Sequence, residues 1–283
     1  MLQALFDQTW LRLIALPFAV CFLLAAALRR VGRSDQHGAS LAGAAIAIAF
    51  AWSAAAELGA PLFPPTASDN ALFYLMAAAL VLAMPFDLFT SPQSTPTRYA
   101  EAAVAILFGL GASIWMRGEA DLWTGLVLIC WSVVVVRLHR LAEAPPLAAA
   151  ALVLTALGLA ATAWAANLSL ERNLAFALAS AAAGYFVLSL IDRGMAFAAA
   201  AVLGGAGALM VLALRLVTLS DALIPSIIIV GFIYFADTPL AFLFAGRPEL
   251  KRWLMPFLIA ALALLPIGLA ALAAYIGIGY EAV

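Results

Sequence analysis

The sequence predicts an all-α fold: a polytopic transmembrane bundle of about ten spanning helices, with both termini outside, on the periplasmic side of a bacterial inner membrane. The first observation is composition, because 67% of the 283 residues are hydrophobic and 10% are charged. Charged residues make up about 25% of a soluble chain. The second is a series of long apolar runs, and the third is an uneven distribution of Arg and Lys between alternate loops. A mean hydropathy of +1.10 agrees with the first.

Charges, prolines and polar clusters divide the chain into ten apolar segments. A spanning helix needs roughly 20 mostly apolar residues to cross a ~30 Å hydrocarbon layer. The expected spans are 9–29, 39–57, 71–89, 99–116, 121–138, 146–166, 173–191, 195–219, 222–244 and 253–279. Only the sequence TLSD around Ser220 separates the eighth span from the ninth. One long kinked element is therefore the alternative at that position.

Basic residues set the predicted orientation, because Arg and Lys near spans are retained on the cytoplasmic side. One set of alternate loops holds Arg29, Arg30, Arg33, Arg98, Arg137, Arg140, Arg193, Arg247, Lys251 and Arg252. The other set holds only Arg117 and Arg172. Both termini are therefore expected outside. Asp7 precedes the first span and RRVGR follows it, so this span is expected to be a retained helix and not a secretory signal.

Short connections leave no room for a soluble domain, so residues 1–283 are expected to form a single integral membrane domain. Gly184, Gly204, Gly205 and Gly207 should let helix backbones approach closely, which is how packing energy is gained in lipid. The expected partners are the lipid bilayer and, through Ala- and Gly-rich helix faces, another membrane protein. A net charge of −1 gives no basic excess for nucleic acid.

The residues that membrane enzymes and redox proteins require are missing from the expected spans. Haem b needs His ligands on facing helices, whereas His37 and His139 are expected in cytoplasmic loops. Zinc hydrolysis would need an H-E-x-x-H pattern, and a serine nucleophile would need a buried His or Lys base. Cys21 and Cys130 stand alone in apolar segments. The sequence therefore predicts no catalytic residues, no cofactor and no metal, and an enzyme ranks third among the functions considered.

Two features of the outer face have alternative interpretations. The loop ELGAPLFPPTASDN, from residue 57, is expected to form a stiff turn after a helix that Gly59 ends, and a loop that grips a ligand is the alternative. Arg12 and Arg215 lie near outer helix ends and could line an outward vestibule for an anion. Snorkelling to the headgroups, with Asp7 or Asp221 as partner, is the preferred interpretation.

The inner acids Asp87 and Asp237 are the main candidate site. Asp87 lies near the inner end of the third span, and Asp237 lies in the inner third of the ninth. A charge at the centre of a spanning helix costs about 2.5–3.5 kcal/mol, so an acid at this depth should be hydrated, paired or capping a helix.

The sequence DTP offers a local reason for Asp237. Thr238 or Asp237 as N-cap, with Pro239 at the first helical position, would restart a short helix after a break. Broken helices at membrane depth are tolerated where they face protein or a water-filled cavity, as in carriers. The predicted substrate or ion path comprises Asp237, Thr238, Pro239, Asp87 and Arg215.

The leading interpretation is a small multi-pass permease or carrier of unknown substrate, with an inward polar site near Asp237 and Asp87. The alternative is a non-transporting subunit or assembly factor of an envelope complex, in which Ala and Gly faces pack against partners and the acids only cap helices. A carrier requires a cavity that reaches the bundle interior with these acids on its wall, and a scaffold does not.

Overall fold

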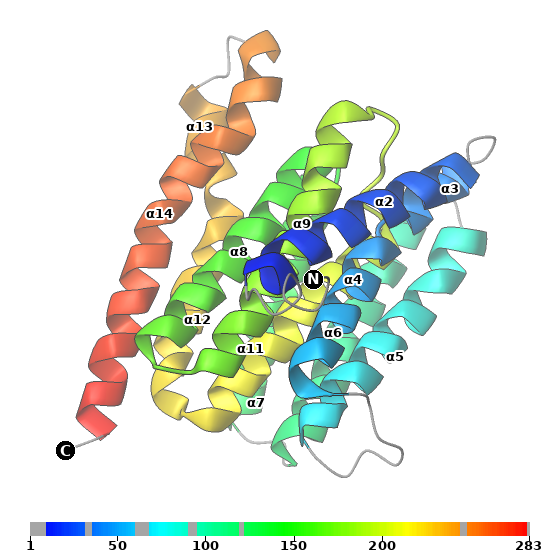
Figure 1. Cartoon of the computed structure of the whole chain (residues 1–283). Coiled ribbons are helices and arrows are strands. Elements are labelled where there is room, and N and C mark those ends of the chain that lie inside the picture. The colour runs from blue at the N-terminus through cyan, green and yellow to red at the C-terminus, as the bar shows by residue number, and fades with distance from the viewer. Residues whose placement is uncertain are drawn as a thin grey trace.

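A computed structural model describes residues 10–31, 36–59, 68–89, 95–118, 122–243 and 248–281. The described chain is built from helices and contains no strand. Figure 1 shows them as one bundle of long, tilted rods. In order they are π-helical η1 (Leu11–Ala15), α2 (Leu16–Val31), α3 (Gln36–Leu41), α4 (Ala44–Leu58), α5 (Ser68–Phe89), α6 (Thr95–Arg117), α7 (Leu122–Leu141), α8 (Pro145–Ala165), α9 (Ser169–Ile191), α10 (Ala199–Ala201), π-helical η2 (Val202–Ala206), α11 (Gly207–Leu219), 3-10 helix η3 (Asp221–Leu223), α12 (Ile224–Gly231), 3-10 helix η4 (Phe232–Phe235), α13 (Asp237–Leu243) and α14 (Pro248–Glu281).

The prediction of a polytopic all-α bundle is confirmed. Among the described residues, nine helical spans are long and apolar enough to cross a membrane. The remaining expected segment, 121–138, is present as the 20-residue helix α7. The eighth and ninth segments are separate, because Ser220 has extended backbone angles and its side chain accepts a hydrogen bond from the Ala222 N–H at 3.2 Å. The eighth begins four residues later than expected, at Ala199, after an irregular loop.

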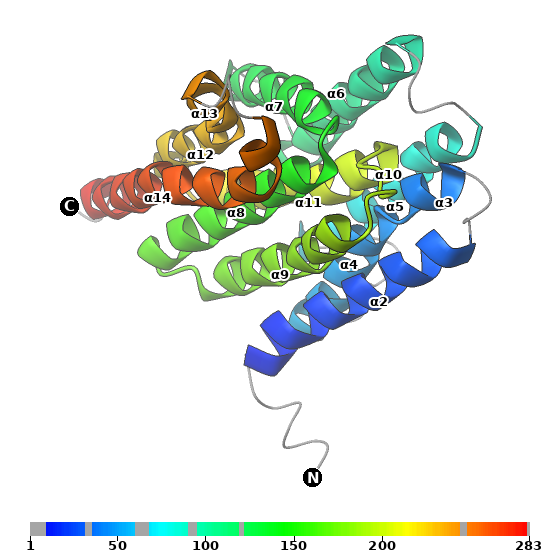
Figure 2. The ribbon, with the colours of Figure 1, turned by 90° about the horizontal axis from the view of Figure 1, so that it is seen from above.

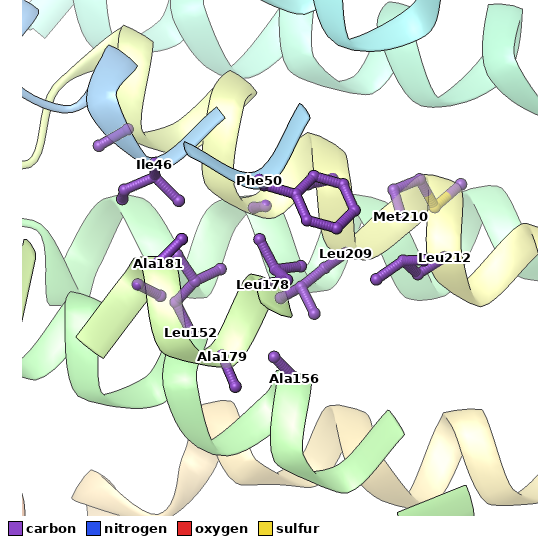
Figure 3. Packing of buried hydrophobic residues seen from close by; sticks show 14 of the residues in the cluster. Ile46, Phe50, Leu152, Ala156, Leu178, Ala179, Ala181, Leu209, Met210 and Leu212 are labelled. Atoms are coloured by element: carbon purple, nitrogen blue, oxygen red, sulfur yellow. The ribbon is translucent and has the colours of Figure 1, made fainter. Parts of the chain in front are cut away.

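The continuous helix α10–η2–α11 is the centre of the bundle. In its most apolar stretch 94% of residues are buried, against 22% in α14 and in the first span. Figure 2 shows α6 and α7 on one side and α2 on the other, with α8, α9 and α11 between them. Leu178 of α9, Leu209 of α11 and Phe50 of α4 meet in the core that Figure 3 shows. The peripheral helices α2 and α14 leave apolar faces for lipid.

Glycines permit the closest helix approaches, as the sequence predicts. A Cβ at Gly184 in α9 would lie 2.5 Å from the carbonyl oxygen of Phe18 in α2. A Cβ at Gly205 would lie 2.6 Å from a methyl group of Leu152 in α8. Real Cβ atoms do not approach so closely, so the backbone contact at Gly184 requires glycine, whereas at Gly205 the Leu152 side chain would have to shift. Both positions therefore serve packing, which drives helix association in lipid.

The helices alternate in direction, and their ion pairs join helix ends on the same side. Arg29 at the end of α2 pairs with Asp192 after α9, and Arg98 at the start of α6 pairs with Glu143 after α7. We call the side that carries these residues the basic end and the other side the opposite end. That the basic end faces the cytoplasm remains a prediction from the distribution of Arg and Lys.

The turn predicted after the second span begins as expected. Gly59 has φ 85° and its N–H donates to the Ala55 carbonyl at 3.0 Å, which confirms it as the residue that ends α4. A positive φ favours glycine, because a side chain would be strained there. The proline-rich residues 60–67 that follow, and Asp7 before the first span, lie outside the described residues.

Candidate functional site at the basic end

The ninth span changes helix type just before Asp237. The α-helix α12 ends at Gly231, a 3-10 turn η4 covers Phe232–Phe235, and α13 begins at Asp237. The predicted interruption is therefore present, although it is milder than an unwound break, because Ala236 keeps right-handed helical backbone angles. The capping prediction is wrong in detail: Asp237 is the first residue of α13, and Pro239 is its third.

The Asp237 carboxylate pairs with Arg137 from the last two turns of α7. The same guanidinium donates to the Thr238 hydroxyl and, through Nε, to the Tyr234 carbonyl, both at 3.2 Å. It also lies over the Phe235 ring, 4.8 Å from the centroid, a cation–π contact. Asp237 thus faces protein and polar groups, because α7 supplies the counter-charge that makes a carboxylate tolerable at this depth.

Asp87 occupies a different position, buried near the end of α5 with 1% of its surface exposed. Its Oδ2 accepts a hydrogen bond from the Ala200 N–H at 2.9 Å, so it caps the first turn of the central helix from a neighbouring helix. A carboxylate there also interacts favourably with the helix dipole. Its Oδ1 is buried and has no hydrogen-bond partner among the described residues.

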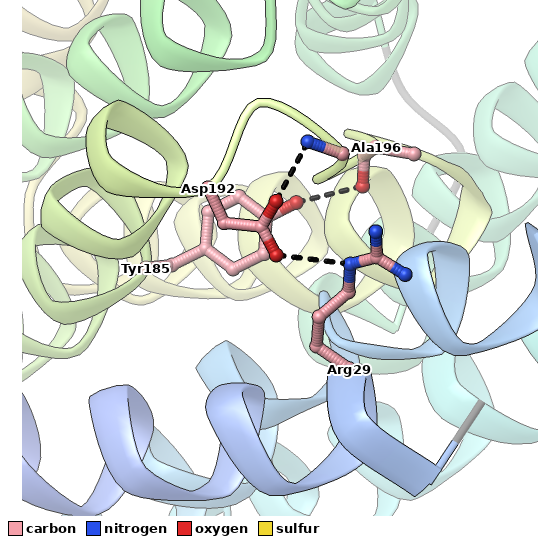
Figure 4. A network of polar contacts seen from close by, with 5 residues as sticks. Arg29, Tyr185, Asp192 and Ala196 are labelled. Atoms are coloured by element: carbon pink, nitrogen blue, oxygen red, sulfur yellow. Dashed lines mark hydrogen bonds and ion pairs between the residues drawn. The ribbon is translucent and has the colours of Figure 1, made fainter. Parts of the chain in front are cut away.

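A polar network holds the loop that leads into this cap. Asp192, after α9, accepts from Arg29 Nε at 3.1 Å and from the Gly194 N–H at 2.8 Å. The buried Tyr185 hydroxyl donates to the Ala196 carbonyl at 2.7 Å, as Figure 4 shows. These contacts fix the path of the chain between α9 and Ala199, and so aim the first N–H groups of the central helix at Asp87.

Both histidines of the chain lie beside these acids, in helices and not in loops as expected. His37, in α3, donates from Nδ1 to the Asp87 backbone carbonyl at 2.9 Å. His139, in the last turn of α7, lies with Nε2 3.5 Å from Glu101 Oε2 of α6. Glu101 is 6% exposed and lies within electrostatic range of Asp87. The loop prediction failed because both flanking helices extend past their apolar runs.

The contacts of His139 make it a candidate proton-binding side chain. Its Nδ1 lies 2.9 Å from the Val135 carbonyl oxygen, which only accepts hydrogen bonds, so Nδ1 carries a hydrogen. Its Nε2 faces a carboxylate oxygen of Glu101, which also only accepts when ionised. A proton on Nε2 or on Glu101 would turn this contact into a hydrogen bond. We call Glu101, His139 and Asp87 the acid–histidine cluster.

The predicted site residues at the basic end therefore separate into two groups on either side of α7. Arg137 contacts Asp237 and Thr238 of α13, whereas His139, two residues later, faces Glu101 of α6. Sequence reasoning named neither Glu101 nor Arg137 as a site residue. Their signal was a single charge near the end of an apolar segment, the same signal that drew attention to Asp87.

At the opposite end, the described part of the chain contains ion pairs between arginines and acidic residues. Arg215 lies 3.0 Å from Glu171, with 8% of each side chain exposed, and Arg12 pairs with Glu57. The expected pairing of Arg215 with Asp221 is wrong, because Asp221 pairs with Arg117, whereas Asp7, the other expected partner, lies outside the described residues. Snorkelling is also wrong for Arg215, because it is buried among helices. Arg215 therefore lies at the opposite end of the bundle from Asp237 and Asp87.

A cavity of about 230 Å³ lies between α7, α8, α11 and α12. Its wall is apolar, with Trp131, Met210 and Ile227 among the lining residues and Thr155 and Tyr234 as the hydroxyl-bearing ones. Neither Asp87 nor Asp237 lines it. This cavity therefore differs from the acid-walled cavity expected of a carrier, although it ends one turn from Arg137. We call it the α7–α12 groove.

Within the described residues, no three His, Cys, Asp or Glu side chains come together as metal ligands. Comparison of the chain with protein-family models and with curated protein sequences finds no match.

Proposed function

We propose that this multi-pass membrane protein is a small carrier that binds a proton at the acid–histidine cluster during its transport cycle. The observation that carries the proposal is the His139–Glu101 contact, because a proton held between the buried Nε2 and Oε2 atoms, 3.5 Å apart, would convert it into a charge-assisted hydrogen bond. Acids and histidines inside membranes are typical of proton relays in transporters. Asp237 and Thr238 belong in the proposal as the polar rim at the same end.

The surroundings of the cluster support proton exchange. The titratable groups that face it are His37 from α3, Asp87 from α5, Glu101 from α6 and His139 from α7. Asp87 Oδ1 and His139 Nε2 are buried without a hydrogen-bond partner among the described residues. Buried polar atoms are normally satisfied, so both atoms need an explanation, and binding of a proton at the cluster supplies one. Arg215 is not included, because Glu171 already compensates it.

A second candidate function, a non-transporting membrane subunit, is favoured by one contact. Asp87 caps the central helix through the Ala200 N–H, and this is a structural role that needs no transport. Exposed apolar faces on α14, such as Leu264 and Leu265, would then receive a partner helix. A non-transporting role does not explain why Glu101 and His139 are buried in contact with each other.

The test is charge movement after a pH jump. We would reconstitute the full chain in liposomes on a solid-supported membrane and record the transient current that follows a pH step without added substrate. A carrier that binds a proton inside the bundle should give a saturable current. Glu101→Gln and His139→Gln should each abolish this current, because each variant replaces one of the two side chains that share the proton.

The matched control is the exposed pair Arg98–Glu143, also between α6 and the end of α7. Arg98→Gln with Glu143→Gln should leave the current unchanged. Absence of current from the folded wild-type protein would overturn the proposal and favour the subunit. Solutes that co-purify, identified by mass spectrometry, would supply the substrates for subsequent uptake assays.

A further inference from the structure

The α7–α12 groove lies on the outside of the bundle, independent of the acid–histidine cluster. Ile129 and Val133 of α7 and Phe232 of η4 form its rim, with 64%, 44% and 59% of their surfaces exposed. These faces lie within predicted or observed spans and therefore meet hydrocarbon. The floor is formed by α8 and α11, through residues such as Thr155 and Met210. A groove with this position is open to a lipid from the side.

The length of the groove matches one leaflet. Leu126 is the first residue of α7 that lines the groove, and Arg137 follows it by eleven residues. At ~1.5 Å per residue this stretch of helix is about 17 Å long. Half of a ~30 Å hydrocarbon core is about 15 Å. An acyl chain that entered at the basic end would therefore reach the middle of the bilayer or slightly beyond it.

The basic end of the groove carries donors suited to a phosphate. Arg137 follows the lining residues Val133 and Val134 by one turn, and its guanidinium contacts Tyr234 and Phe235, which also line the groove. Its contacts in the described part of the chain use Nε and Nη2, so the two Nη1 hydrogens remain for a ligand. Thr238 adds an exposed hydroxyl beside it.

The floor carries one further polar group. The Tyr234 hydroxyl is buried beside the Thr155 hydroxyl, which donates to the Ala151 carbonyl at 2.7 Å. Tyr234 precedes Asp237 by about one helical turn, so it lies below the headgroup level, where the ester carbonyls of a phospholipid would be.

We infer that the α7–α12 groove binds one anionic phospholipid from the leaflet at the basic end, with an acyl chain along the groove and its phosphate at Arg137. The apolar length, the exposed rim and the arginine at one end together fit this occupant. A partner helix would use the rim but not the phosphate donors. A second copy of the chain would bury the rim and exclude the lipid.

The experiment is native mass spectrometry of the delipidated full-length protein titrated with palmitoyl-oleoyl phosphatidylglycerol, and with the phosphatidylcholine of the same chains. The wild-type protein should retain one phosphatidylglycerol with at least tenfold higher affinity than further lipids. Gly231→Phe should remove this bound lipid, because a side chain at Gly231 meets open space inside the groove. Gly111→Phe, also facing open space but on α6 outside the groove, is the matched control.

Two charge variants test the headgroup. Arg137→Gln should reduce the preference for phosphatidylglycerol over phosphatidylcholine to about unity, and Asp237→Asn should increase it, because the arginine loses its carboxylate. If Gly231→Phe does not fold, Val133→Trp fills the rim of the same groove. Equal lipid retention by wild-type, Gly231→Phe and Val133→Trp proteins would mean annular lipid only and overturn the inference. A dimer that carries no lipid would overturn it in favour of a second copy.

Discussion

The two ends of the bundle bury charge in different ways. At the opposite end, Arg215 and Glu171 are both buried and form an ion pair of guanidinium and carboxylate. At the basic end, Glu101 and Asp87 are as deeply buried, but their neighbours are His139 and a helix N-terminus. Arginine keeps its charge at any physiological pH, whereas histidine does not. The first arrangement therefore pairs two groups of fixed charge, whereas the second places a carboxylate beside a side chain that can gain or lose a proton.

This difference shows that burial of an ionisable residue does not by itself identify a site. Arg215 was a candidate because it is a charged residue inside an apolar span. Its ion pair with Glu171 explains that charge without a functional role. Glu101 was not a candidate from the sequence, but its neighbour His139 has no fixed charge, so the buried carboxylate still needs an explanation. The type of counter-group therefore decides which intramembrane charges are candidates for function.

The largest expected effect is on the fixed pair. Arg215→Met leaves Glu171 buried without a counter-charge, so the free energy of unfolding should fall by about 3–5 kcal/mol. Thermal unfolding in detergent micelles, followed by circular dichroism, measures this. Adding Glu171→Leu should restore most of the loss, because the pair is then replaced by apolar groups. A loss below about 1 kcal/mol would mean that water or another group compensates Glu171.

A smaller effect is expected at Asp87. Asp87→Ala removes the cap on the central helix and should cost about 0.5–2 kcal/mol, whereas Asp87→Asn, which keeps an acceptor oxygen for the Ala200 N–H, should cost less. The same unfolding assay compares them. If Asn destabilises as much as Ala, the negative charge and not the hydrogen bond is what the helix start requires.

Glu101→Gln should change stability by no more than about 1 kcal/mol, because the amide N–H can donate to His139 Nε2 in place of the shared proton. Glu171→Gln is the matched substitution at the opposite end, and it should be more harmful because Arg215 loses its carboxylate. Equal losses for the two glutamines would contradict the distinction between a proton-dependent and a fixed pair.

The smallest effect is expected for the exposed pair Arg98–Glu143, whose side chains are 42% and 67% exposed. Arg98→Gln should cost at most about 0.5 kcal/mol, because exposed ion pairs are weak and screened by salt. Increasing the salt concentration should remove this difference and leave the Arg215→Met loss largely unchanged, since screening does not reach a buried pair.

Much of the architecture was predictable because lipid imposes simple rules. Apolar length predicted the spans, and Ser220 separated the eighth from the ninth as the polar sequence TLSD suggested. Gly184 and Gly205 were recognisable as packing positions, since only small residues allow helices in lipid to touch. The interruption before Asp237 followed from a charge and a proline close together in an apolar run.

The sequence by itself therefore determined the class, the spans and the residues whose charge needs an explanation. The tertiary structure alone decided their partners: Arg137 for Asp237, Glu171 for Arg215 and His139 for Glu101. Each pair joins helices distant along the chain, and which helix end meets which depends on packing of nearly uniform Ala- and Leu-rich surfaces. Hydropathy carries no information about that choice, because all such surfaces are equally soluble in lipid.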